Sequence, residues 1–201
     1  MDKTKTGSAG RSSQLRLRTL TLALLAVCMS LAACSRRGHW STAERGSAGV
    51  APEVALDEAA VLVYAAAAYG WRGYFADHTW VATKRSGDSD YVIYEVLGWR
   101  VYQRLPVVAV SHGAPDRYWY GAEPRELAQV RGERAAALID KVEAAVESYP
   151  WSDQYHIFPG PNSNTFTAWI ARQVPELGLE LPMRAIGKNY VDSAPDNSND
   201  G

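Results

Sequence analysis

Two short segments of the sequence carry side chains that could act together as a nucleophile and its base. The first segment places His78 at the start of an apolar run rich in β-branched residues. The second follows a Pro-Gly-Pro turn and places Ser163 where a helix should begin. A serine hydroxyl becomes a nucleophile when an imidazole accepts its proton, and the free N–H groups of a helix amino terminus can stabilise an oxyanion. The two residues are therefore candidates for a nucleophile and its base.

Other polar residues near these two segments could complete such a site. Glu95 lies in the strand expected to pair with that of His78, so its carboxylate could orient the imidazole. The side-chain amides of Asn162 and Asn164 flank the serine and could donate to an oxyanion. Trp80, two residues after the histidine, is assigned to substrate binding. These assignments give Ser163, His78 and Glu95 as candidate catalytic residues.

A structural interpretation of the same residues stays open. Serine and asparagine at a helix start often cap the free backbone N–H groups, which stabilises a helix by ~1 kcal/mol. Ser163 would then be a cap, and His78 a buried histidine with a satisfied hydrogen bond. His112 and Asp116 fit a polar loop, with no metal site. The run Tyr118-Trp119-Tyr120 fits either a surface patch facing a sugar or lipid or part of the core.

The elements that must position these residues are strands in the first half of the domain. Residues 60–65 form a short apolar run typical of a buried strand, and residues 77–84 and 91–97 carry the β-branched and aromatic residues that strands favour. Turn residues at 85–90 join the last two into a hairpin. A further strand is expected over 104–110, and its proline places it at a sheet edge or at the start of the strand.

The second half of the domain is predicted to be helical. Apolar residues recur at spacings of three and four over 131–149, and Pro150 ends that pattern. A second helix is expected from the Asn162–Asn164 segment to about Val174. Strands followed by helices favour an α+β fold with a small antiparallel sheet packed on helices.

The order of these segments resembles the circularly permuted papain-like fold. That clan includes relatives of NlpC peptidases and lecithin-retinol acyltransferases, in which the histidine precedes a nucleophilic cysteine. Residues 162–166, Asn-Ser-Asn-Thr-Phe, resemble the Asn-Cys-Asn-His-Phe pattern of one peptidase group, with Ser163 in place of the cysteine. This resemblance places His78 as the base of Ser163 and implies a hydrolase or acyltransferase that acts on an amide or an ester. Over most of the mature chain, residues 73–80, 160–166 and 185–190 resemble an uncharacterised bacterial family defined only as a domain of unknown function.

The amino terminus has the features of a lipoprotein signal peptide. A basic stretch is followed by a short apolar run that ends in Leu31-Ala32-Ala33-Cys34. The run is shorter than the ~20 apolar residues that a transmembrane helix needs. We therefore expect cleavage after residue 33 and acylation of Cys34, for example with palmitate. Ser35, where an aspartate would retain the protein in the inner membrane, favours the outer membrane with the domain facing the periplasm.

This interpretation divides the chain into four parts and limits its partners. They are a signal peptide (1–33), a lipidated spacer (34–57), an α+β domain (58–190) and a disordered tail (191–201). The signal peptide holds five of the 21 lysines and arginines and one of the 22 acids, so the mature chain carries a net charge of −5 and no basic surplus for nucleic acid. Its only cysteine would be acylated, so no disulfide or thiolate metal site is expected, nor any cofactor. The expected partners are the membrane and an envelope peptide, glycan or lipid.

Overall fold

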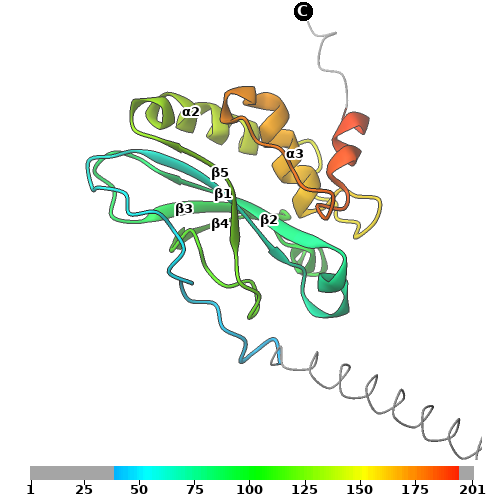
Figure 1. The fold of residues 1–201 in the computed structure, drawn as a ribbon. Helices are drawn as coiled ribbons and strands as arrows, with labels where there is room; N and C mark the ends of the chain where they lie inside the picture. The colour runs from blue at the N-terminus through cyan, green and yellow to red at the C-terminus, as the bar shows by residue number, and fades with distance from the viewer. Residues whose placement is uncertain (1–38, 195–201) are drawn as a thin grey trace, which may run out of the picture. The chain divides into compact units, whose positions relative to one another are not determined.

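Five antiparallel strands form one sheet, and two helices pack against one of its faces (Figure 1). The structure is a computed structural model that describes residues 39–194. The strand order across the sheet is β4-β3-β2-β1-β5, so β3, β2 and β1 lie in the interior. The predicted α+β class, with a small antiparallel sheet packed on helices, is confirmed. The strands are β1 (Ala60–Ala67), β2 (Asp77–Lys84), β3 (Tyr91–Val96), β4 (Val108–Gly113) and β5 (Arg125–Arg131).

Within residues 39–194, the two α-helices come from the second half of the chain, and short 3-10 helices fill several of the connections. Helix α2 spans Glu133–Glu147, and α3 spans Ser163–Gln173. Apolar side chains of α2 face the sheet at spacings of three and four, as the sequence pattern requires. The 3-10 helices are η1 (Gly70–Tyr74), η2 (Gly98–Gln103), η3 (Pro175–Leu177) and η4 (Lys188–Ser193).

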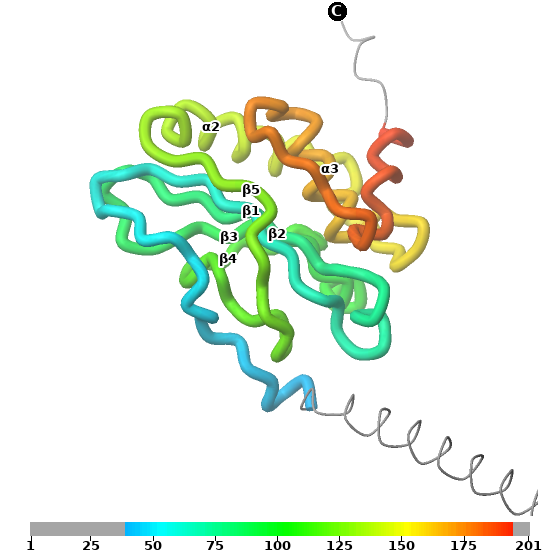
Figure 2. The backbone as a smooth tube through the Cα atoms, in the orientation of Figure 1, coloured from blue at the N-terminus to red at the C-terminus, as the bar shows by residue number. Residues whose placement is uncertain are grey.

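Apolar side chains cover both faces of the sheet and form two separate clusters. On the face that carries the helices, Val63 and Val81 pack with Ile139 of α2 and Phe166 of α3. On the other face, Tyr64 and Trp80 pack with residues of the β4–β5 connection such as Trp119. Figure 2 shows this connection running below the sheet, on the side away from α2 and α3. A strand such as β2, buried along its whole length, therefore has no solvent face.

The predicted strands agree well with the structure, and one strand was missed. The range 77–84 is β2, and 91–97 contains β3, with the expected turn between them. The strand expected over 104–110 begins later, at Val108, and lies at a sheet edge as its proline predicted. Strand β5 was missed because Arg-Glu-Leu-Ala-Gln-Val-Arg has few apolar residues, which an exposed edge strand does not require.

The segment 44–57 was assigned to the spacer, but it packs against the domain. The buried carboxylate of Asp116 accepts hydrogen bonds from Ser47 Oγ (2.8 Å), from Val50 N (2.7 Å) and from Ala51 N (3.0 Å). The compact unit accordingly begins at Glu44. At the other end, η4 continues the domain to Ser193, past the predicted boundary at residue 190.

The amino-terminal predictions fall outside the described residues. The signal peptide, Cys34 and residues 195–201 of the predicted tail all lie there. Among residues 39–194, the structure has no helix long and apolar enough to cross a bilayer.

Gly187 offers a test of the contact between the carboxy-terminal segment and α3. Its φ is +95°, and a Cβ atom would lie 2.3 Å from Nδ2 of Asn162, the residue that caps α3. Gly187→Ala should therefore lower the free energy of unfolding by ~2–4 kcal/mol, through steric overlap added to the cost of a positive φ.

The matched control is Gly178→Ala. Gly178 has a φ of +60°, but no atom lies within 4 Å of its Cβ position. This variant should lose only the ~1 kcal/mol that a left-handed backbone costs an L-residue. Urea denaturation of both variants measures the difference, and equal losses would contradict the tight packing assigned to Gly187.

Candidate functional site

The amino terminus of α3 is closed by a reciprocal cap in which Asn162 is the N-cap residue. Its Oδ1 accepts hydrogen bonds from the backbone N–H groups of Asn164 (2.9 Å) and Thr165 (3.2 Å). Thr165 Oγ1 in turn accepts from the backbone N–H of Asn162 (3.1 Å). This is a capping box, which satisfies N–H groups that the helix itself cannot. The interpretation of Ser163 as the cap is therefore wrong, because Ser163 is the first residue inside the helix.

The amide groups of Asn162 and Asn164 are fully used in holding other backbone segments. Asn162 Nδ2 donates to the carbonyl oxygens of Ile157 and Ile186, both at 3.1 Å. Asn164 Nδ2 donates to the carbonyl oxygens of Asp77 (3.0 Å) and Ile186 (2.8 Å). Each amide has two N–H donors, so neither has one left for an oxyanion. The predicted role of these two residues as oxyanion donors is therefore corrected to a structural one.

Thr79 of β2 is the residue that faces the start of α3. Its side chain is fully buried, and its Oγ1 lies 2.9 Å from Thr167 Oγ1 and 3.1 Å from Asn164 Oδ1. The same oxygen lies 3.2 Å from the carbonyl oxygen of Ser163. These contacts join the sheet to the first turn of the helix.

His78 precedes Thr79 and points to the opposite face of the sheet. Its ring stacks on Trp119, with ring centroids 3.6 Å apart and planes 9° from parallel. Its Nε2 lies 2.9 Å from Oε2 of Glu95 on the neighbouring strand β3. Trp119 belongs to the apolar cluster on the face that lacks helices, and so does Trp80, which follows His78 by two residues. The structure thus brings His78 and Glu95 together, as strand pairing had suggested.

The prediction that His78 and Ser163 face each other is wrong. Successive side chains of a strand point to opposite faces of a sheet, so His78 and Thr79 cannot both face α3. The hydrogen bonds of Thr79 place it on the helix side, which leaves His78 on the other side. Within residues 39–194, no hydrogen bond joins Ser163 Oγ to an imidazole. Ser163 is itself buried, with 5% of its surface exposed.

Glu95 lies between His78 and Arg117 in a buried hydrogen-bonded network. One carboxylate oxygen accepts from His78, and the other pairs with the guanidinium of Arg117. Burial by itself would raise the pKa of Glu95, but its hydrogen bonds to His78 and Arg117 outweigh that effect and hold the pKa below its usual value. Glu95 is therefore an ionised carboxylate, neutralised by Arg117, and it can only accept hydrogen bonds.

The imidazole of His78 is neutral in this network. Burial lowers its pKa, the neighbouring Glu95 carboxylate offsets only part of the effect, and the Arg117 charge adds to it. Because the carboxylate only accepts, the proton of the neutral ring lies on Nε2. Nδ1 then keeps its lone pair, but the described residues place no nucleophilic hydroxyl in hydrogen bond with it. The described residues thus hold the His78 ring in one orientation but place no nucleophilic side chain beside it.

Trp80 was predicted to bind substrate, but it belongs to the core. Its side chain is completely buried, its Nε1 donates to the carbonyl oxygen of Pro115 (2.7 Å), and it stacks on Tyr64. A residue with no exposed surface cannot contact a ligand from solvent. Its indole instead helps to hold the β4–β5 connection on the sheet.

Sequence reasoning missed Arg117 and Trp99, which extend the network to the surface. Trp119 is buried and stacks on His78, whereas Trp99 is 42% exposed and stacks on Trp119 with ring centroids 6.3 Å apart. Tyr120 meets both tryptophans edge-on. The run Tyr118-Trp119-Tyr120 was the one signal for this cluster, and it turns out to serve the core through Trp119. In the part of the chain that the structure describes, no group of three or more His, Cys, Asp or Glu side chains could hold a metal ion.

Comparison with known proteins assigns the chain to a family and gives no activity. A family model described as "Protein of unknown function (DUF3750)" matches residues 58–190. The chain belongs to this family, in agreement with the resemblance to an uncharacterised domain family. No curated protein and no solved structure matches the chain.

The neutral state of His78 predicts how stability depends on pH. In the unfolded chain a histidine binds a proton below pH ~6.5, whereas the folded chain keeps this ring uncharged. The unfolded state then binds more protons, so stability should fall as the pH drops through that value, by up to ~1.4 kcal/mol per pH unit. His78→Gln, which can still donate to Glu95, should be less stable at neutral pH but lose less stability on acidification.

Denaturation midpoints measured between about pH 5.5 and 7.5, a window around the unfolded histidine pKa, check this expectation. His112→Gln is the matched control, because His112 is an exposed side chain on β4 and its removal should leave the wild-type profile unchanged. A His78→Gln profile as steep as the wild type would contradict the buried neutral imidazole.

Proposed function

We propose that this member of the DUF3750 family is a lipid-anchored protein of the bacterial cell envelope whose domain serves as a ligand-binding or structural module rather than as a serine hydrolase. The permuted papain-like architecture belongs to the same proposal, as that of a catalytically inactive relative. One observation carries the non-enzymatic part: His78 and Ser163 lie on opposite faces of the sheet.

The surroundings of each member of the pair support this function. His78 is held by Glu95 and Trp119, so moving its ring to the helix face would require leaving an ionic hydrogen bond and a stacked indole. Ser163 is buried at the start of α3, and a serine needs a base in hydrogen-bond contact, since its hydroxyl is far less acidic than a thiol. A helix dipole alone, which can activate a cysteine, does not suffice for serine.

The anchor part of the proposal rests on the sequence Leu31-Ala32-Ala33-Cys34. Acylation of Cys34 would place the domain at a membrane surface, and the ten residues from Cys34 to Glu44 would form the tether. A single acyl chain binds a bilayer only marginally, whereas a diacylglyceryl thioether provides a durable anchor. Ser35 favours the outer membrane, with the domain in the periplasm.

Cys34→Ala tests the anchor. The wild-type chain, expressed in a bacterial host, should lose the mass of its signal peptide, gain the mass of its lipids and fractionate with membranes. The variant should lack the lipid mass and leave the membrane fraction or remain unprocessed. Intact mass spectrometry and detergent partitioning measure both properties. A wild-type protein without lipid mass would overturn the anchor.

Ser163→Ala tests the absence of serine chemistry. Wild-type protein should not react with a fluorophosphonate probe, because no base contacts the hydroxyl. The substitution should change the free energy of unfolding by less than ~1 kcal/mol. Asn162→Ala, which removes the N-cap and both hydrogen bonds of Nδ2, should cost ~2 kcal/mol or more. Labelling of the wild type that disappears in Ser163→Ala would show a working nucleophile and overturn the non-enzymatic proposal.

A further inference from the structure

Exposed apolar side chains gather at one end of the domain. Of the 14 large apolar residues that are exposed in the described part of the chain, ten lie in four short segments. Isolated exposed apolar residues are ordinary, but a contiguous group marks an interaction surface. The ten residues are Trp71, Tyr74 and Phe75 in and after η1, Trp99, Val101, Tyr102 and Leu105 in and after η2, Ile157 and Phe158 before α3, and Met183.

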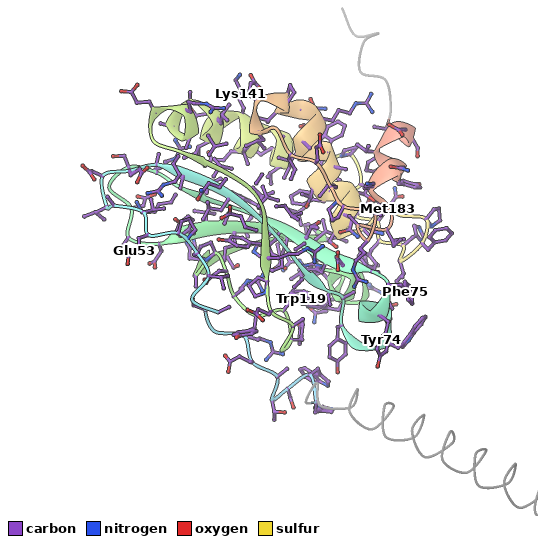
Figure 3. The ribbon with its side chains drawn as sticks, in the orientation of Figure 1. Glu53, Tyr74, Phe75, Trp119, Lys141 and Met183 are labelled. Carbon is purple, nitrogen blue, oxygen red and sulfur yellow. The ribbon has the colours of Figure 1, made fainter. Side chains whose placement is uncertain are left out.

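Direct contacts join the four segments into one surface. The guanidinium of Arg184 donates to the carbonyl oxygens of Tyr74 (2.8 Å) and Gly73 (2.9 Å), which ties the segment containing Met183 to η1. The ring of Tyr155 lies directly over Gly98 at the start of η2, where no Cβ atom would fit. Figure 3 places Tyr74, Phe75 and Met183 at the same end of the domain.

Tyr120 joins the two 3-10 helices on this surface. Tyr69, just before η1, has its ring centroid 5.3 Å from that of Tyr120, and Trp99 of η2 has its centroid 6.2 Å away. We call the surface made by residues 69–76, 97–107, 154–158 and 183–190 the aromatic-basic face.

The charge of this face is opposite to that of the mature chain. Its four segments contain five basic residues and no aspartate or glutamate, although the mature chain carries a net charge of −5. Asp77, which follows the first segment, is buried and pairs with Arg184 and Arg125. Within residues 39–194, Arg184 is the only basic residue of the four segments that forms an ion pair with an acidic side chain. The five basic residues are Arg72, Arg100, Arg104, Arg184 and Lys188.

Tryptophan, tyrosine and arginine together suit the boundary between a bilayer and water. The rings of tryptophan and tyrosine have an apolar body and one polar group, which fits the headgroup level, and basic residues such as arginine are attracted to anionic lipids. The same residues also occur at protein interfaces. The tether favours the membrane, because its ten residues extend at most ~35 Å and hold Glu44 within that distance of the bilayer. The carbonyl oxygen of Glu44 accepts from the backbone N–H of Gly121 (2.9 Å), next to Tyr120, so this attachment point lies beside the face.

We propose that the aromatic-basic face rests on the anionic headgroup layer of the membrane to which the chain is anchored. The choice of the membrane as the occupant rests on the lipid anchor proposed above. Met183 (91% exposed) and Tyr102 (90% exposed) would enter the headgroup layer, and Arg72 and Arg104 would meet lipid phosphates. The face would thus orient the domain, with α2 directed away from the bilayer.

A fluorescent probe at a single introduced cysteine tests this orientation. The mature chain has no free thiol when Cys34 is acylated, so Tyr102→Cys provides a unique label site. Ala137→Cys is the matched control, because Ala137 is exposed on α2, which lies far from η1 in Figure 1. The full chain, recovered as the host processes it, is mixed with vesicles of phosphatidylethanolamine and phosphatidylglycerol that contain doxyl-labelled lipid.

The probe at position 102 should shift to the blue and be quenched by the doxyl groups, and the probe at 137 should not. Arg72→Glu with Arg104→Glu should weaken the vesicle contact about fivefold or more per charge, and phosphatidylcholine vesicles should weaken it similarly. Equal quenching at 102 and 137 would overturn the proposal. So would a probe at 102 that is already shielded without vesicles, which would show that a protein covers the face.

Acylation and orientation are measured separately, so their failures are distinguishable. Intact mass reports the lipid on Cys34 in the same sample in which quenching reports the face. An acylated chain with a water-exposed probe at 102 would refute the aromatic-basic face and leave the anchor standing. A chain without lipid mass would refute the anchor. A quenched probe at 102 in a chain that also carries Cys28→Ala and Cys34→Ala, so that position 102 holds the single thiol, would support the face independently of the anchor.

Discussion

The alternation of side chains along β2 determines what this domain can do. Thr79 points to α3 and joins the sheet to the first turn of that helix, so its neighbour His78 must point to the other face. No rotamer change of His78 alone can bring it through the sheet. The separation of the histidine from Ser163 is therefore a property of the strand register, which the pairing of β2 with β1 and β3 fixes on both sides. A register slip of one residue would also exchange the two apolar cores, which makes the arrangement robust.

Because this register places His78 and Glu95 on the face without α-helices, the buried network around Glu95 can hold the β4–β5 connection on the sheet. The face without helices is covered by an irregular connection, and irregular segments cannot hold themselves by a backbone ladder. Arg117 and Trp119 of that connection meet Glu95 and His78 of the sheet, and Asp116 binds the backbone of the segment 44–57. Loss of one partner from a buried ion pair commonly costs several kcal/mol, because the other charge remains buried. Polar residues that resemble a catalytic site thus hold the cover of the second core.

The sequence predicts the strands better than it predicts which side of the sheet a residue faces. In a strand with one wet face, polar and apolar residues alternate and reveal the direction of each side chain. Strand β2 is buried on both faces, so His78, Thr79 and Trp80 carry no such signal. The contact of His78 with Glu95 could be foreseen from strand pairing, because it depends on neighbouring strands alone. The place of Ser163 relative to them could not, because it depends on which face the helices cover, and Arg117 comes from a loop without periodicity.

The same network also links the core to the aromatic-basic face. His78 stacks on Trp119, and Trp119 stacks on Trp99, whose ring is partly exposed on η2. The 3-10 helix that carries Trp99 has poor intrinsic stability, since its hydrogen bonds are strained and its runs are short. Stacking against Trp119 gives it a fixed support, and Glu95 fixes Trp119 through His78 and Arg117. A rigid base under exposed aromatic side chains reduces the conformational entropy that binding must overcome. The histidine that sequence patterns assign to catalysis is therefore placed to hold a surface in shape.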